Sequence, residues 1–233
     1  MAITAKSSGK ERELVPAGNY FAVVVGVFDI GTQPPNNPKY DPVHKVILQF
    51  ELHRKKGVCR DKEEKPLRIS GFYPLAFGRK KNKEKAKLRQ AVEGILGRSF
   101  TEEEAKEGYD IAELLDTSCR LVVAHDTGED GTMYDQIQSL SPLEEDDPEP
   151  RPESDSILYE MDPDSEIPDE VPEWVQRMIK KSKEWRDVNG DGDGKPSRGG
   201  HPKTGVSRPS RAKSARKGKD DDESDDDDDD MPF

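Results

Sequence analysis

The chain has 233 residues, of which 37% are charged and only 31% hydrophobic, and its formal net charge at pH 7 is −12. This is poor in core-forming residues for one globular domain of that length, so we expect a folded part joined to disordered parts. Two cysteines without metal-ligand spacing argue against a disulfide scaffold and favour a reducing compartment. No apolar run is long enough to span a membrane, and the N-terminus lacks the apolar segment of a signal peptide. We therefore expect a cytoplasmic protein without a membrane partner.

Charge is distributed unevenly along the chain. Residues 1–140 hold 22 basic and 21 acidic side chains, whereas residues 141–233 hold 15 basic and 28 acidic ones. The acidic average therefore hides a nearly neutral N-terminal part, and the net charge alone identifies no class of partner.

The first predicted elements are a flexible N-terminus over 1–15 and a domain over 16–142. Tyr20 to Ile30 is rich in aromatic and β-branched residues and predicts a long strand, in which Gly26 indicates a bulge or tight bend. His44 to Leu52 alternates apolar and polar residues, which predicts a strand that is buried on one face only. Its predicted solvent face carries Lys45, Gln49 and Glu51.

The rest of this domain adds one strand, a helical region and two more strands. Leu67 to Phe77 predicts the third strand, and Asn82 to Leu96 predicts a helix that ends at Gly97. Thr101 opens a capping box before a short second helix, and Asp110 starts a further turn. The last two strands are predicted at Arg120–His125 and Met133–Leu140. The predicted order is three strands, a helix and two strands. This is the order of a mainly β, five-stranded OB-fold barrel, whose helical insertion lies between strands 3 and 4. An open sandwich has the same order.

Beyond residue 142 the composition changes to that of a disordered C-terminal region. Residues 143–170 form an acidic linker and 187–219 a Gly/Asp-rich and then basic linker, while 220–233 is an acidic tail. One amphipathic helix is predicted at 171–186, with Trp174 and Trp185 on its apolar face. So short a helix is unstable alone. It must pack on the barrel, on a second copy in a homodimer, or on a partner.

No catalytic or cofactor motif is recognisable in the chain, and we expect neither an enzyme nor a bound cofactor or metal. The acidic run from Asp187 to Asp193 resembles the start of an EF-hand calcium loop. However, the closing position is Arg198 instead of a bidentate glutamate. A flexible linker is the preferred interpretation.

A basic block coincides with the third predicted strand. Residues 53–91 hold fourteen basic side chains and four acidic ones. Cations that neutralise phosphates, together with exposed rings that stack on bases, are typical of proteins that bind single-stranded nucleic acid without strong sequence preference. The alternative is that the rings belong to the core and the lysines to an ordinary solvated surface. The candidate binding residues are Arg54, Lys55, Lys56, Arg60, Arg68, Tyr73, Phe77, Arg79, Lys80 and Lys81.

The end of the chain predicts a docking peptide. Six consecutive aspartates precede an apolar ending whose last residue is aromatic. A like-charged run stays solvated, and an apolar tip on it suits capture in a pocket with a basic rim. The alternative is a plain solubility tail. The candidate docking residues are Asp228, Asp229, Asp230, Met231, Pro232 and Phe233. This ending resembles the acidic C-terminal tip of bacterial single-stranded DNA-binding proteins.

Three further stretches resemble a family of phage-encoded single-stranded DNA-binding proteins. They are PAGNYFAVVVGVFDIGTQ (16–33), GRSFTEEEAKEGYDIAELLDTSCRLVVAH (97–125) and PEWVQRMIKKSKEW (172–185). The resemblance implies an OB-fold and a role in phage DNA replication, recombination or repair in the host cytoplasm. The partners it implies are single-stranded DNA and, through the tip, replication and recombination enzymes.

Two other functions fit the same sequence. One is a protein-interaction adaptor that does not bind DNA, with the basic block as its docking surface. The other is an acidic DNA mimic or a chaperone of basic proteins. Salt-sensitive binding of short oligonucleotides distinguishes the DNA-binding hypothesis from both.

Overall fold

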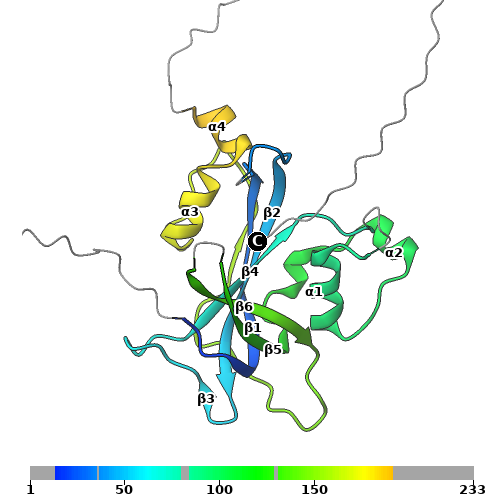
Figure 1. Ribbon diagram of the computed structural model, residues 1–233, viewed down its shortest axis with the longest axis vertical. Coiled ribbons are helices and arrows are strands. Elements are labelled where there is room, and N and C mark those ends of the chain that lie inside the picture. Colours follow the sequence, from blue (N-terminus) through cyan, green and yellow to red (C-terminus); the bar gives the residue numbers. More distant parts are fainter. Residues whose placement is uncertain (1–13, 36, 80–83, 129–130, 191–233) are drawn as a thin grey trace, which may run out of the picture. The chain divides into compact units, whose positions relative to one another are not determined.

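A computed structural model describes residues 14–35, 37–79, 84–128 and 131–190 and confirms the mainly β class (Figure 1). The strands in chain order are β1 (Gly18–Gln33), β2 (Val43–Arg54), β3 (Gly57–Val58), β4 (Arg68–Pro74), β5 (Ser118–Thr127), β6 (Met133–Ser141) and β7 (Ile157–Tyr159). The helices are α1 (Lys87–Leu96), α2 (Glu102–Glu107), α3 (Glu173–Ile179) and α4 (Lys183–Asn189), with a 3-10 helix at Ile111–Leu114. The predictions for residues 1–13 and 191–233 lie outside the described residues.

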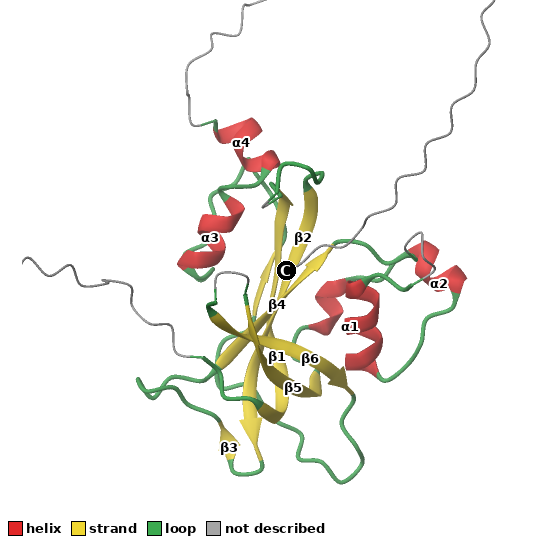
Figure 2. Ribbon diagram, in the orientation of Figure 1, coloured by secondary structure: helices red, strands yellow, loops and turns green. Residues whose placement is uncertain are grey.

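The long strand β1 organises the sheet (Figure 2). It pairs antiparallel with β2 along most of its length and with β5 through its first half, while β7 joins it in parallel at Gly26–Phe28. The hydrogen-bonded order is β3-β2-β1-β5-β6, with β4 also paired to β2. The main helix follows β4 and precedes β5, as predicted. No ladder joins β4 to β6 among the described strands, so the sheet is not closed and does not form the complete five-stranded barrel.

A bulge bends β1 where the sequence predicts one. The register with β2 shifts between Val24 and Gly26 and again between Asp29 and Thr32. A Cβ atom on Gly26 would lie 2.4 Å from the Phe28 ring, so the bend depends on the missing side chain. The bend also separates the two neighbours of β1, because β5 pairs before it and β7 pairs after it.

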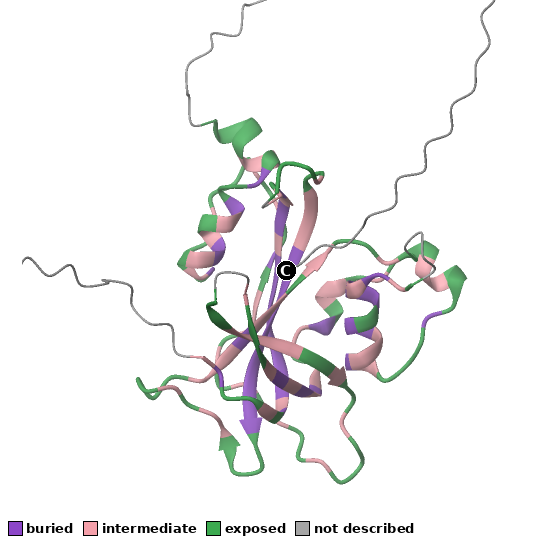
Figure 3. Cartoon of the chain, viewed as in Figure 1, coloured by how far each residue is buried: buried purple, intermediate pink, exposed green. Residues whose placement is uncertain are grey.

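Two hydrophobic cores form on opposite faces of the sheet (Figure 3). The first contains the inward side chains of β2 together with those of β1, β5 and α1. The second is smaller and joins the opposite face of β1 and β2 to β7 and α3. Val175 and Ile179 of α3 are fully buried there, and burial of each such side chain contributes about 1.5–3 kcal/mol. The second core therefore holds the C-terminal segment on the sheet.

The prediction that β2 is buried on one face only is wrong. Gln49 and Glu51 of its predicted solvent face are buried, and so is Ile47 on the same face. Residues 143–190, which include the predicted acidic linker, cover Ile47 and Glu51. Within that segment β7 pairs with β1, and the backbone N–H groups of Glu153 and Ser154 donate hydrogen bonds to Glu51.

The predicted amphipathic helix is two short helices, α3 and α4. The chain turns at Ser182, whose hydroxyl caps α4 by accepting a hydrogen bond from the Trp185 N–H. The sequence left open whether this segment packs on the barrel, on a second copy or on a partner. In the structure, both helices pack on the sheet. The N–H and hydroxyl groups of Thr32 donate to the Glu184 carboxylate at 2.8 and 2.5 Å, which ties α4 to β1.

The capping signals around α1 and α2 are confirmed. Gly97 ends α1 in the left-handed conformation with φ 67°, and Thr101 forms the predicted capping box with Glu104. The helix α1 starts at Lys87, later than predicted, and packs closely on β6. The tightest approach is at Gly94, where a Cβ atom would lie 2.7 Å from the Leu140 carbonyl oxygen.

We expect Gly94→Ala to lower the free energy of unfolding by about 1–2 kcal/mol. Forcing α1 away from β6 costs more than the roughly 1 kcal/mol that alanine gains over glycine in a helix. Urea denaturation measures the difference. Gly78→Ala is the control, because a Cβ atom there meets nothing within 4 Å. Equal unfolding midpoints for the two variants would contradict this packing.

Candidate nucleic-acid interface

The structure divides the predicted binding residues between the two ends of β4. Antiparallel pairing sets Arg68 opposite Glu51 and Pro74 opposite Lys45 on β2. Arg68 therefore lies at the end of the sheet that carries the β2–β3 hairpin, whereas Arg79 follows the far end of β4. A seven-residue strand separates the two groups by about 20 Å. Lys80, Lys81 and the docking residues Asp228–Phe233 lie outside the described residues.

The hairpin group comprises Arg54, Lys55 and Lys56, which are all exposed. The Arg54 guanidinium lies 5.1 Å from the centre of the Tyr20 ring, and its Nη2 atom is 3.4 Å from the Tyr20 hydroxyl. None of the three forms an ion pair within 4 Å with a carboxylate of the described residues. Their charge is therefore available to an anion from solution.

Arg60 follows the hairpin but is neutralised by an acid from the C-terminal segment. Its Nη2 atom donates to both carboxylate oxygens of Glu153 at 2.7 and 2.8 Å. Its Nη1 atom donates to the Glu64 carbonyl oxygen at 2.8 Å. Arg68 is half-buried, and its Nη1 atom lies 3.5 Å from Gln49 Oε1. Arg60 is therefore paired with a carboxylate, whereas the contact of Arg68 is to a neutral amide oxygen.

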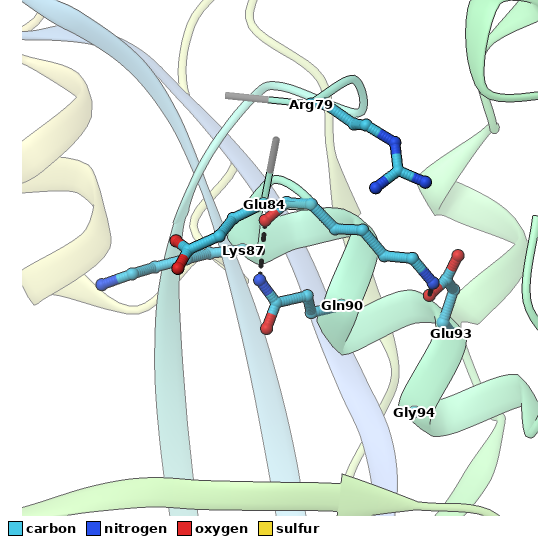
Figure 4. Close-up of a pocket in the computed structure, with 7 residues that line it drawn as sticks. Arg79, Glu84, Lys87, Gln90, Glu93 and Gly94 are labelled. Atoms are coloured by element: carbon cyan, nitrogen blue, oxygen red, sulfur yellow. Dashed lines mark hydrogen bonds and ion pairs between the residues drawn. The ribbon is translucent and has the colours of Figure 1, made fainter. Parts of the chain in front are cut away.

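Arg79 borders a shallow surface depression beside α1 (Figure 4). Arg79 lies 3.0 Å from Glu102, and the ammonium group of Lys85 lies 2.5 Å from Glu93. Figure 4 shows Arg79 and Glu93 on one side of this depression, with Lys87 extending away from it. The buried Arg89 donates to Glu93 and to the Phe100 carbonyl oxygen. Ion pairs within the chain therefore neutralise much of the positive charge at this end of β4.

The predicted platform of stacking rings is not formed. Tyr73 packs against the first core, and burial raises the pKa of its phenol. Phe77 rests on Phe100 and Tyr109, with ring centres 5.0 and 6.1 Å away. The exposed ring of β4 is Phe72, on the opposite face and 6.2 Å from the Trp174 ring. Tyr73 and Phe77 share a face, and that face points into the core.

Sequence reasoning missed Glu51, which organises the surface beside the hairpin. Its carboxylate is fully buried and accepts hydrogen bonds from the backbone N–H groups of Glu153 and Ser154 at 2.8 and 2.9 Å. The Ser154 hydroxyl and the His53 ring complete its partners. Burial by itself would raise the pKa of Glu51, but these hydrogen bonds outweigh it and leave the pKa lowered. The carboxylate therefore stays ionised and holds the chain at Ser154.

Arg120 was missed as well. It projects from β5 and donates to Asp147 through Nη2 at 2.7 Å and to Glu144 through Nη1. Between this pair and Glu51, the Ser118 hydroxyl donates to the Pro150 carbonyl oxygen at 3.1 Å. Residues 144–154, here called the acidic strap, thus run from β5 to β2 along one face of the sheet. We found no local signal for this course in the sequence.

Comparisons with known proteins add no relative. Neither a scan against protein-family models nor a search of curated proteins found a match to this chain. Within the described residues, no helix is long and apolar enough to cross a membrane, and no cluster of three His, Cys, Asp or Glu side chains could hold a metal ion. The candidate interface therefore rests on the geometry given above.

We expect Glu51→Gln to lower the free energy of unfolding by about 1–3 kcal/mol at pH 7. The amide keeps the shape of the side chain but loses the charge that accepts these buried hydrogen bonds. Urea denaturation is the measurement, and Glu160→Gln is the exposed control. Equal stability of the two variants would contradict the anchoring role of Glu51.

The Glu51→Gln variant also tests how the free energy of unfolding depends on pH. Because the folded-state pKa of Glu51 lies below its ordinary value of 4.5, the ionised group stabilises the fold above that pH. This contribution is lost as the pH falls through the lowered pKa. The stability difference between Glu51→Gln and the unaltered chain should therefore shrink in acid. A constant difference from pH 7 to pH 3 would show that ionisation of Glu51 is irrelevant.

Proposed function

We propose that the protein binds single-stranded DNA without strong sequence preference and acts in phage DNA replication or recombination. The observation that carries this proposal is the exposed hairpin Arg54–Lys56, whose three cations have no carboxylate partner among the described residues. Phosphates of a nucleic acid are the most common ligand for such a group of cations. No catalytic role is assigned to the protein.

The arrangement of the strands supports this proposal. The pairs β1–β2, β2–β4, β1–β5 and β5–β6, with α1 between β4 and β5, match a five-stranded OB barrel except for its closing ladder. OB folds are partly open barrels that bind oligonucleotides along their second and third strands and the adjoining loops. In this chain those strands correspond to β2 and β4, and the hairpin continues directly from β2.

The acidic C-terminal tail supports the second half of the proposal. Residues 220–230 hold ten acidic side chains and are followed by Met231, Pro232 and Phe233. We propose that this tail docks on replication and recombination enzymes, with Phe233 in an apolar pocket and the aspartates on its basic rim. We also propose that, without DNA, the tail occupies the basic surface, and that DNA displaces the tail and frees Phe233 for partners.

A protein-interaction adaptor is the second candidate function. The observation that favours it is the packing of Tyr73 and Phe77 into the core, which leaves no stacking platform on that face. Instead, Phe72 and Leu75 expose 46% and 45% of their surface, as a docking site for protein would. An adaptor would be indifferent to oligonucleotides.

Lys55→Gln/Lys56→Gln is the direct test of the hairpin. Fluorescence anisotropy of a labelled oligo-dT at several salt concentrations should show weaker binding by the variant. Loss of two phosphate contacts should also reduce the slope of log K against log salt by about 1.4. The control Lys180→Gln/Lys181→Gln removes the same charge from exposed positions after α3. Identical curves for the two variants would exclude the hairpin as the binding site.

Truncation after Lys219 tests the tail. The shortened chain should bind oligo-dT more tightly than the full chain, with the largest gain at low salt, because an intramolecular polyanion no longer competes. Deleting only residues 231–233 is the matched control, since it leaves all ten acidic side chains of 220–230 in place. Unchanged affinity and salt slope after the long truncation would overturn the proposal that the tail competes with DNA for the basic surface.

A further inference from the structure

The acidic strap crosses three strands on one face of the sheet. Arg120 on β5 lies opposite Phe21 on β1, which in turn lies opposite His53 on β2. In the adjacent row of the same face, Ser118 lies opposite Val23, and Val23 lies opposite Glu51. Two strand spacings, about 10 Å across the sheet, and one step of two residues along it therefore separate the Arg120 and Glu51 attachment points. The strap bridges them, and Val23 beneath it is completely buried.

The strap is attached in two physically different ways. At Glu153 and Ser154 its backbone N–H groups bind the carboxylate of Glu51, which is itself fully buried. Its acidic side chains instead bind arginines near the surface. The side chains of Arg60 and Arg120 are 37% and 35% exposed, and those of Glu153 and Glu144 are 48% and 72% exposed, whereas that of Asp147 is 9% exposed. Glu153 and Glu144 can therefore leave the arginines while the backbone stays in place, and release of Asp147 is the costlier step.

These two arginines extend the positive charge of the hairpin. Arg60 lies in the loop after β3, six residues beyond Arg54 in the chain. The pKa of Asp147 is lowered chiefly by its hydrogen bond from Arg120 and to a smaller extent by the charge of Lys55. The hairpin and the Asp147 end of the strap therefore act on each other electrostatically. A strand of phosphates that reaches Lys55 also approaches this arginine.

A carboxylate bound to a guanidinium occupies the same donors that a phosphate uses. The Nη2 group of Arg60 donates to both carboxylate oxygens of Glu153, and Arg120 presents its Nε and Nη2 atoms to Asp147. Both geometries suit a phosphate equally well. The exposed pairs of Arg60 with Glu153 and of Arg120 with Glu144 contribute little to stability, so their exchange for a phosphate is inexpensive.

We propose that Arg60 and Arg120 are phosphate-binding residues masked by Glu153, Glu144 and Asp147 of the acidic strap, and that single-stranded DNA displaces these side chains. Glu51 keeps the strap backbone on the sheet throughout. This inference rests on the proposed DNA-binding function. It adds Arg120 to the interface and gives the strap a regulatory role, because its charge sets the affinity.

The test compares two triple substitutions in the full chain by anisotropy of labelled oligo-dT over a salt series. The strap variant is Glu144→Gln/Asp147→Asn/Glu153→Gln. The control, Glu160→Gln/Asp164→Asn/Glu166→Gln, removes the same charge from exposed positions beyond the strap. The strap variant should bind about tenfold more tightly than the control, with a salt slope steeper by about 1.4 for two additional free arginines.

A further substitution distinguishes unmasking from a general change in charge. Arg120→Gln in the strap variant should lower the affinity again by about threefold, which is the share of the gain that Arg60 does not supply, whereas unchanged affinity would overturn the role of Arg120. Glu153→Gln alone keeps the backbone attachment to Glu51 and should give about a threefold gain. Because the strap backbone stays attached in this single variant, its gain in affinity cannot come from detachment of the strap.

The outcomes separate the two hypotheses. If the unaltered chain binds oligo-dT and the strap variant matches the control, the masking is wrong and the proposed function stands. If no form binds oligo-dT at any salt concentration, both are overturned. Binding by the strap variant alone would support both.

Discussion

The buried carboxylate of Glu51 determines the course of the chain after β6. An ionised group that is removed from water needs hydrogen-bond donors, and the sheet itself supplies only His53. The remaining donors are the backbone and hydroxyl groups of Glu153 and Ser154, one hundred residues later in the sequence. Once Ser154 is held there, β7 lies beside β1 three residues later. The segment from the strap to α4 is thus part of the folded sheet.

This attachment also sets the electrostatics of the surface. It brings the most acidic part of the described chain onto arginines of β5 and of the loop after β3. Local neutralisation follows, whereas the hairpin cations Arg54–Lys56 stay exposed without a carboxylate partner among the described residues. The proposed interface is therefore narrower than the basic block of the sequence, and part of that block is controlled by its own counter-charges.

Features that depend on neighbouring residues were predictable from the sequence. The alternation in β2, the bulge at Gly26, the αL residue at Gly97 and the capping box at Thr101 each have a local physical cause. The hairpin cations were predictable for the same reason, since a short polar turn between strands is exposed.

Features that depend on distant contacts were not predictable. Glu51 is read as a solvent-facing residue because nothing near it indicates a buried partner. The strand β7 is only three residues long and lies in an acidic stretch, so it gives no periodic signal. Tyr73 and Phe77 were candidates for stacking on bases, but the alternation of residues in a strand does not say which face becomes the core. In the structure, α1 and Phe100 cover the face that carries Tyr73 and Phe77, which makes it part of the first core.

The central claim is that phosphates replace carboxylates on Arg60 and Arg120. The most direct measurement is NMR of the arginine Nε–Hε resonances in the full chain as unlabelled oligo-dT is added. We predict saturable shifts of the Arg60 and Arg120 signals, while the signal of Arg89, which is buried against Glu93 and Phe100, stays in place. Saturated binding that leaves the Arg60 and Arg120 signals unmoved would contradict the account.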